Sequence, residues 1–141
     1  MGIDLLVLDD DQEIIKNVKR IAREEGISCI AYASGIGVIN YLKSCADEEL
    51  PLGYLIDMRI ITMDGDSETQ NLEGDAPEEI YRILEGKKRT KYFRYFTGHY
   101  SPHDEGVEGR TRAIVIVKGQ EVEQELRKFF DEIKTTRQGT E

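Results

Sequence analysis

Carboxylate side chains follow two apolar runs of this sequence, at the points where buried strands should end. Asp57 closes the run Gly53-Tyr54-Leu55-Ile56, and the run Leu5-Leu6-Val7-Leu8 ends in Asp9-Asp10-Asp11. If the two strands are neighbours in a parallel sheet, their carboxyl ends meet in one crevice, which is where open α/β folds bind ligands. Carboxylates gathered in a crevice attract positive charge. The sequence therefore predicts a cation site around Asp57.

Two further polar residues come directly after apolar runs. Thr97 follows residues 92–96, and Lys118 follows residues 113–117. In chain order, the strand ends thus carry a pair of acids, a single acid, a hydroxyl and an amine. Each residue alone has an ordinary explanation, because an acidic pair can cap a helix and a lysine is usually solvated. We interpret Asp11 in this ordinary way, as the N-cap of the first helix.

The elements that must position these residues alternate along the chain. Apolar runs are followed by segments with helical spacing, which is typical of βα units around a parallel sheet within one domain. We expect five strands, at Ile3 to Leu8, Ser28 to Tyr32, Tyr54 to Ile56, Tyr92 to Phe96 and Ala113 to Val117.

Four segments repeat apolar residues at helical spacing. Gly26 should end the first helix, Asp75 to Glu79 should begin the third, and the last should end near Lys134, before a flexible tail at 135–141. Residues 62–75 and 98–112 lack this pattern, so we expect a loop and a short or irregular fourth crossover helix. The apolar positions are Ile14, Val18, Ile21 and Ala22, then Val38, Ile39, Leu42 and Ala46, then Ile80, Ile83 and Leu84, and finally Val122, Leu126, Phe129, Phe130 and Ile133.

The order of the strand-end residues resembles the receiver domain of two-component response regulators. That family has an acidic pair after the first strand, a phosphoacceptor aspartate after the third, a threonine or serine after the fourth and a lysine after the fifth. Asp57-Met58-Arg59 followed by Met63-Asp64-Gly65 is similar to the family's loop after the phosphorylated aspartate. The resemblance implies a flavodoxin-like (CheY-like) doubly wound sheet of five parallel strands with helices on both faces. The domain would span residues 1–134.

This resemblance also implies a metal. A carboxylate that attacks a phosphoryl group is repelled by the phosphoryl oxygens, so a divalent cation must neutralise the developing charge. Mg²⁺ prefers hard oxygen ligands and keeps several waters, so a few carboxylates suffice. By resemblance, Asp10, Asp57 and the backbone carbonyl of Arg59 are direct ligands, and Asp9 acts mainly through water.

The implied activity is transfer of a phosphoryl group onto Asp57 from a histidine kinase or phosphotransfer protein, followed by autodephosphorylation, without turnover of a separate substrate. Lys118 would offset the carboxylates at rest and hold a phosphoryl oxygen after transfer. Thr97 would hydrogen-bond another oxygen and pull on the loop after it, which signals to a downstream protein.

Three positions depart from the family pattern. Ile61 and Gly119 stand where prolines are common, and Val115 stands where a tyrosine or phenylalanine reports phosphorylation. Glycine leaves the backbone after the lysine freer. We therefore expect that output does not use the family's common surface in the usual way.

Two variable residues keep alternative interpretations. Arg59 either pairs with the phosphoryl group and slows its hydrolysis or forms a salt bridge to a surface acid such as Asp64. His99 is either a partly protonated neighbour of the phosphate or a solvated loop histidine, and the second is favoured.

Two rival functions are considered, and the departures at Ile61, Val115 and Gly119 support the first of them. A pseudo-receiver would keep the fold and signal through partners without phosphorylation. An aspartyl-nucleophile, Mg²⁺-dependent phosphatase would need an acid two residues after the nucleophile, and Arg59 occupies that place.

Charge and composition limit the partners. The net charge of −9 opposes binding to nucleic acid, despite the basic and aromatic stretch at 87–95. The chain start lacks signal-peptide features and no apolar run reaches the roughly 20 residues of a membrane helix, so we expect a cytoplasmic protein. Cys29 and Cys45 have no metal-ligand spacing and are interpreted as buried thiols. Too few residues follow Ile133 for an attached effector, so we expect a stand-alone protein or a piece of a longer chain.

Overall fold

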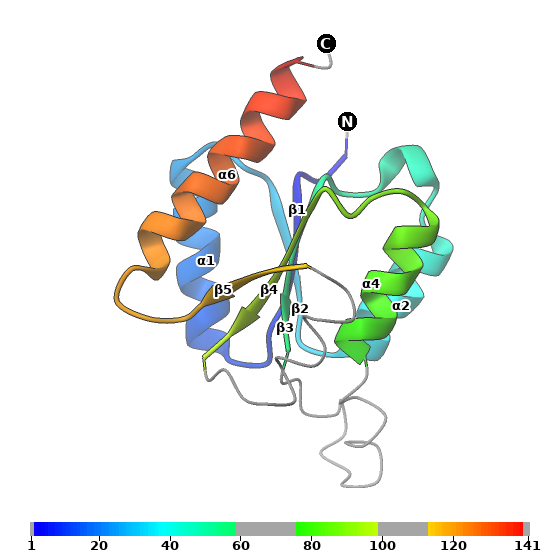
Figure 1. The fold of residues 1–141 in the computed structure, drawn as a ribbon, viewed down its shortest axis with the longest axis horizontal. Coiled ribbons are helices and arrows are strands. Elements are labelled where there is room, and N and C mark those ends of the chain that lie inside the picture. Colours follow the sequence, from blue (N-terminus) through cyan, green and yellow to red (C-terminus); the bar gives the residue numbers. More distant parts are fainter. Residues whose placement is uncertain (1, 59–75, 99–112, 140–141) are drawn as a thin grey trace, which may run out of the picture.

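The structure is a computed structural model that describes residues 2–58, 76–98 and 113–139 (Figure 1). Its centre is one sheet of five parallel strands in the order β2-β1-β3-β4-β5. All five predicted strands are present, with small shifts at their ends. Their bounds are β1 Leu5–Leu8, β2 Cys29–Tyr32, β3 Gly53–Asp57, β4 Tyr92–Thr97 and β5 Ile114–Val117.

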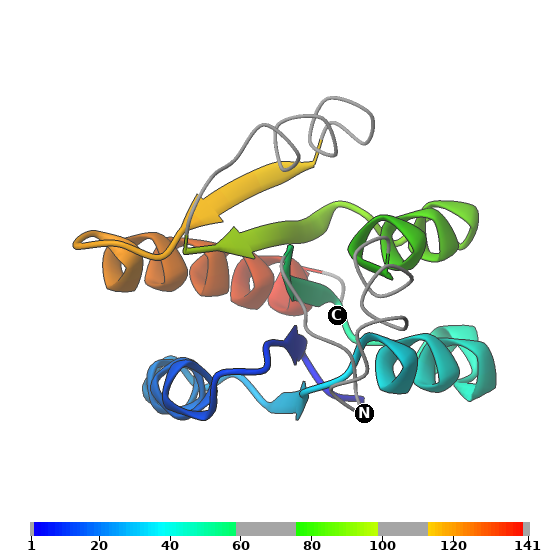
Figure 2. The ribbon, with the colours of Figure 1, turned by 90° about the horizontal axis from the view of Figure 1, so that it is seen from below.

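Helices cover both faces of this sheet. Figures 1 and 2 show α1 and α6 side by side on one face and α2 and α4 on the other. The predicted doubly wound, flavodoxin-like class is confirmed. The helix bounds are α1 Gln12–Glu24, α2 Gly35–Ser44, α4 Ala76–Gly86 and α6 Val122–Gly139, with a short 3₁₀ helix at Asp47–Glu49.

Alternation along the strands divides the core into two layers. Leu5 and Val7 pack with the apolar residues of α1 and α6, whereas Leu6 and Leu8 pack with those of α2 and α4. All four β1 side chains are fully buried because both faces of the sheet are covered. This is why the central strands appear in the sequence as unbroken apolar runs.

The start and end of α1 agree with the sequence. Asp11 is the N-cap, and its Oδ1 accepts hydrogen bonds from the backbone N–H of Glu13 at 2.9 Å and of Ile14 at 3.4 Å. Gly26 follows the helix with φ of +75°, a conformation that favours glycine. The N-cap fixes where α1 begins after the carboxyl end of β1, and Gly26 fixes where the chain turns toward β2.

Two predicted helix positions are wrong. Ala46 lies beyond α2 and is exposed, because the backbone is already extended at Cys45. The last helix does not end near Lys134 but continues to Gly139. Its last turns are held against the start of the sheet by an ion pair from Arg137 to Asp4, at 2.6 Å, and by a hydrogen bond between Tyr92 and Thr136. Flexibility of the tail stays a prediction.

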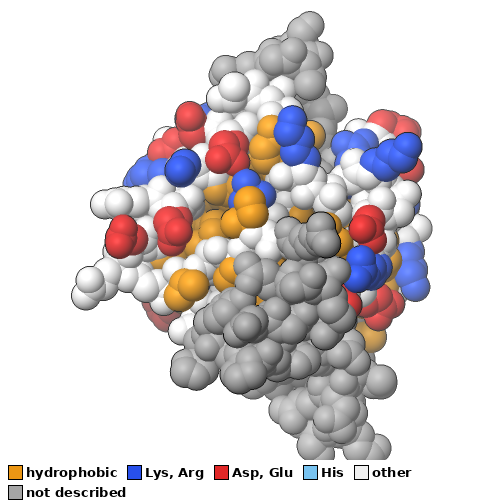
Figure 3. Space-filling view, viewed as in Figure 1, with side chains coloured by type: hydrophobic (Ala, Val, Ile, Leu, Met, Phe, Trp, Pro, Cys, Tyr) orange, Lys and Arg blue, Asp and Glu red, His pale blue; other side chains and the backbone are white. Residues whose placement is uncertain are grey.

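The predicted loop at 62–75 and the fourth crossover at 98–112 fall almost entirely outside the described residues. Among the residues drawn in colour in Figure 3, acidic and basic side chains are interleaved. Within the described part of the chain, no helix has the length and apolar character needed to cross a membrane.

Candidate functional site

The carboxyl ends of β1 and β3 bring the predicted acids together. These strands are paired with Leu8 opposite Ile56, so Asp9 and Asp57 follow at neighbouring positions of one sheet edge. Asp9, Asp10 and Asp57 each offer a carboxylate oxygen, and these oxygens lie within 4.8 Å of one another. The predicted carboxylate cluster is therefore present.

Burial makes this cluster unusual. Asp9 is 0% exposed and Asp57 is 4% exposed, while Asp10 is half-buried. Asp9 Oδ1 accepts the backbone N–H of Asp11 at 2.9 Å, and the Asp9 N–H donates to the carbonyl of Tyr32 at 3.0 Å. These bonds hold the turn after β1. Buried carboxylates also require a counter-charge, because each unpaired buried charge raises the free energy of the folded state by roughly several kcal/mol.

Lys118 supplies that counter-charge. Its Nζ lies 2.7 Å from Asp9 Oδ2 and 3.3 Å from Asp57 Oδ2, and its backbone N–H donates to the Thr97 carbonyl at 2.8 Å. Burial alone would lower the pKa of Lys118, but the nearby carboxylates of Asp57 and Asp9 outweigh it and raise that pKa above its ordinary value. The ammonium reaches the acids even though Gly119 follows the lysine.

Thr97 lies at the same edge of the sheet. It ends β4, whose preceding residue Phe96 is paired with Asp57, and it is fully buried. The structure thus gathers all the predicted strand-end residues that it describes. Arg59, Ile61, Asp64, His99 and His103 lie outside the described residues.

The charge and the donor atoms suit a divalent cation. In the described part of the site, three carboxylates stand against one ammonium, so acidic groups outnumber basic ones there. The donors are hard oxygens, which Mg²⁺ prefers, and Asp10 is partly open to solvent. Asp9, Asp10 and Asp57 are therefore the described side chains that fit a Mg²⁺ ion.

Sequence reasoning missed one neighbour of the site. The Phe96 ring lies beneath the Lys118 ammonium, with 4.9 Å between Nζ and the ring centroid. Only the strand register could have indicated this contact, because Phe96 is otherwise an ordinary apolar strand residue. Val115, one of the three departures from the family pattern, is partly buried against the core layer of α2 and α4. An aliphatic side chain fills the position where the family commonly has an aromatic ring.

Comparison with known proteins identifies the fold. No protein-family model and no curated protein matches the sequence. A CheY-like response regulator receiver domain protein from Methanospirillum hungatei has a TM-score of 0.68 and 18% identity, with 96% of this chain and 99% of that one covered. A two-component response regulator from Legionella pneumophila has a TM-score of 0.69 and 20% identity, with 95% and 99% covered.

A third solved structure with this fold contains a metal ion. The receiver domain of a sensor histidine kinase from Pseudomonas aeruginosa has a TM-score of 0.64 and 13% identity, covers 93% of this chain and 99% of its own, and has a magnesium ion coordinated in its active-site cleft. The class defined by the sheet order and these likenesses is a flavodoxin-like α/β domain. More narrowly, the chain has the CheY-like receiver-domain fold.

Proposed function

We propose that this protein is a receiver of two-component or phosphorelay signalling that accepts a phosphoryl group from a phosphohistidine donor onto Asp57, with Mg²⁺. The observation that carries the proposal is the cluster of Asp9, Asp10 and Asp57, with the Lys118 ammonium 2.7 Å from Asp9 and 3.3 Å from Asp57. The position of this cluster at the carboxyl edge of a sheet with the receiver-domain fold supports the proposal. The donor would be a histidine kinase or phosphotransfer protein, met in the cytoplasm.

The proposed step is a displacement at phosphorus. An Asp57 oxygen forms a bond to phosphorus while the bond from phosphorus to the donor's imidazole nitrogen breaks. The departing nitrogen keeps the electron pair of that bond, and the product on Asp57 is an acyl phosphate. Mg²⁺ held by Asp9, Asp10 and Asp57 would supply positive charge that offsets repulsion between the attacking carboxylate and the phosphoryl oxygens.

Lys118 and Thr97 would then contact the new phosphoryl group. The ammonium is already 3.3 Å from Asp57 Oδ2, so a small movement brings it to a phosphoryl oxygen, while its contact with Asp9 persists. Thr97, at the end of the adjacent strand, would offer its hydroxyl to another oxygen. Both residues therefore act by stabilising charge on the product.

Mass spectrometry after incubation with a small phosphodonor and Mg²⁺ tests this proposal. We expect one phosphoryl group on the wild type, mapped to Asp57, and none on Asp57→Asn. Asp11→Asn is the matched control, because it alters a neighbouring acid outside the cluster and keeps a capping side chain. A phosphoryl group on a different residue, or none at any donor concentration with Mg²⁺ present, would overturn the proposal.

The second candidate is the pseudo-receiver. It is favoured by Val115, which lacks the aromatic ring of the common switch, and by Gly119 after the lysine. Titration with Mg²⁺ and then beryllofluoride, followed by NMR of the amides of Asp57 and Thr97, separates the two functions. Chemical-shift changes at both amides support the phosphorylated receiver. Amide resonances that stay unchanged with both ligands support the pseudo-receiver.

A further inference from the structure

The Lys118 side chain crosses an aromatic ring on its way to the carboxylates. Its Nζ lies 4.9 Å from the centroid of the Phe96 ring, which is within the range of a cation–π contact. Phe96 is 1% exposed, and the Lys118 side chain is 16% exposed. The ammonium therefore meets the ring in a place where water competes little.

The strand register explains why the ring is there. Phe96 pairs with Asp57 on one side and with Ile116 on the other. It therefore stands between the acceptor residue and the strand that delivers the lysine. Its side chain belongs to the core layer of α1 and α6, together with Leu55 and Ile116. The Lys118 ammonium thus lies over a ring whose residue stands between β3 and β5.

Among the described residues, the other contacts of the lysine are its ion pairs to Asp9 and Asp57 and one backbone hydrogen bond. Its backbone N–H is held by Thr97, but the next residue is Gly119, which is exposed and has nothing within 4 Å of where a Cβ would stand. Gly98 flanks the lysine on the other side, and a Cβ there would come no closer than 3.6 Å to Lys118 Cδ. A lysine has a long, flexible stem, so it needs a surface that directs it.

We propose that Phe96 is a positioning residue for Lys118: its ring helps to hold the ammonium where it forms ion pairs with Asp9 and Asp57, beside the glycines at 98 and 119. The ring attracts the ammonium electrostatically and supplies an apolar floor for the methylene stem. The positioning of Lys118 by the ring does not depend on the proposed function. Only its consequence for phosphorylation rests on that function.

The direct test compares Phe96→Leu with Phe130→Leu in the metal-free protein. Phe130 is fully buried in the same core layer, and among the described contacts it has no lysine above its ring. NMR relaxation of the ε-methylene of Lys118, assigned by its loss in Lys118→Met, reports how rigidly the side chain is held. We expect its order parameter to fall in Phe96→Leu and to stay at the wild-type value in Phe130→Leu.

A conservative variant and a second NMR measurement complete the test. Phe96→Tyr keeps the ring face and should keep Lys118 ordered. Nuclear Overhauser contacts between the Lys118 ε-methylene and the Asp57 β-protons should be present in the wild type and lost in Phe96→Leu. A Lys118 side chain that is as ordered in Phe96→Leu as in the wild type, or disordered equally by Phe130→Leu, would overturn the proposal.

The functional consequence is measured as a rate. With a small phosphodonor and Mg²⁺, Phe96→Leu should be phosphorylated roughly threefold to tenfold more slowly than Phe130→Leu, as the strength of a partly buried cation–π contact implies. Equal rates for the two variants would contradict this consequence. If the wild type is not phosphorylated at all, the proposed function fails, and the relaxation reading still decides the role of Phe96.

Discussion

At the scale of single residues, the site is a problem of buried charge. Asp9 and Asp57 are almost fully buried, and Lys118 lies between them. Such an arrangement persists only if each charge has a partner, because taking an ion out of water costs more than most contacts return. The residues proposed to receive and hold a phosphoryl group should therefore also contribute to the stability of the resting fold.

Lys118→Met tests this contribution. The change keeps the stem but removes the charge, so we expect the free energy of unfolding at pH 7 to fall by on the order of 2 kcal/mol. The folded-state pKa of Lys118 is raised, so its stabilisation is fully present below the ordinary value of 10.5 and is lost as the pH rises through the folded-state value. Urea unfolding from pH 7 to 11 should show the wild-type advantage narrowing only above about pH 10.5.

Lys128→Met is the control for that series, since Lys128 has no ion pair among the described residues of α6. A Lys118→Met variant as stable as Lys128→Met at pH 7 would show that the ammonium does not stabilise the resting site.

Tyr54 carries a buried polar group that, unlike the Lys118 ammonium, should not stabilise the fold. Its hydroxyl is buried without a hydrogen-bond partner among the described residues, and this burial raises the pKa of the phenol. A buried, unpaired hydroxyl costs free energy, so Tyr54→Phe should leave the free energy of unfolding unchanged or raise it. In contrast, Tyr92→Phe removes the hydrogen bond to Thr136 and should cost about 1 kcal/mol. Chemical denaturation of the two variants in parallel measures both effects. A clear loss of stability in Tyr54→Phe would show that the Tyr54 hydroxyl makes a stabilising hydrogen bond.

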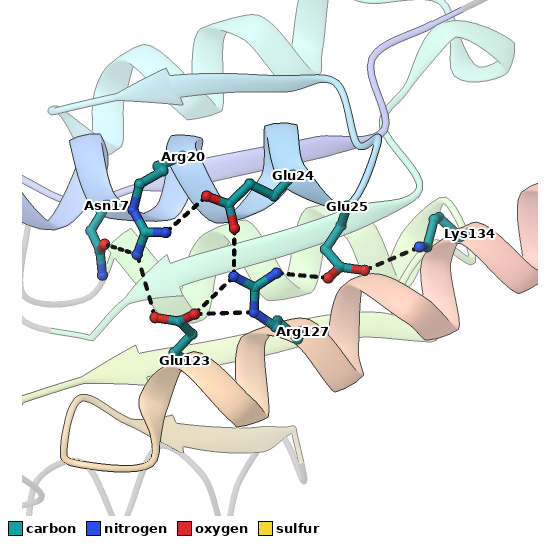
Figure 4. Close-up of polar contacts among 7 residues, drawn as sticks. All are labelled: Asn17, Arg20, Glu24, Glu25, Glu123, Arg127 and Lys134. Carbon is teal, nitrogen blue, oxygen red and sulfur yellow. Dashed lines mark hydrogen bonds and ion pairs between the residues drawn. The ribbon is translucent and has the colours of Figure 1, made fainter.

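At the scale of elements, α1 and α6 are joined by a network of ion pairs on one side of the sheet. Figure 4 shows Arg127 of α6 reaching Glu24, Glu25 and Glu123, at 2.6, 2.8 and 2.8 Å. Arg20 and Lys134 extend the network to either side. Hydrogen bonds from Arg127 are the largest influence that lowers the pKa values of all three glutamates.

Arg127→Gln should therefore lower the midpoint of urea unfolding at neutral pH and low salt. A carboxyl group with a lowered folded-state pKa contributes stability above its ordinary value of 4.5 and loses it as the pH falls through the folded-state value. The difference from wild type should shrink below about pH 4.5 and also in high salt, which screens exposed pairs. Lys128→Gln, one residue along, should show no such dependence, and a salt-independent loss in Arg127→Gln would point to packing instead of charge.

Local patterns predicted most elements for a physical reason. Strands buried on both faces must be apolar throughout, and helices that cover a sheet must repeat apolar residues, so both appear in the sequence. The end of α6 was missed because it depends on Arg137 and Asp4, which are 133 positions apart. Likewise, the spacing predicted Ile14 as an apolar position of α1, whereas Ile15 is buried there and Ile14 is only partly buried.

At the scale of the whole molecule, the candidate site exists only in the folded chain. Its acids come from residues 9, 10 and 57 and its amine from residue 118, and the parallel sheet alone brings them together. The positions of these residues after successive apolar runs predicted that they lie at one edge of the sheet. The contact of Phe96 with Lys118 was beyond that reasoning, because it depends on the register of three strands.

Mg²⁺ should consequently stabilise the whole fold. A ligand that binds only the native state raises the free energy of unfolding, by about 2.7 kcal/mol when its free concentration is a hundred times the dissociation constant. We expect the urea midpoint of the wild type to rise with Mg²⁺ and to saturate, because the ion adds positive charge to a cluster of three carboxylates.

The matched variants are Asp10→Asn and Asp11→Asn. The first removes a carboxylate of the cluster and should abolish most of the Mg²⁺-dependent rise. The second removes the neighbouring acid, keeps its capping bonds to α1 and should retain the full rise. If Mg²⁺ raised the midpoint of both variants equally, the ion would be acting on the general acidity of a chain with net charge −9, and the carboxylate cluster would not be its site.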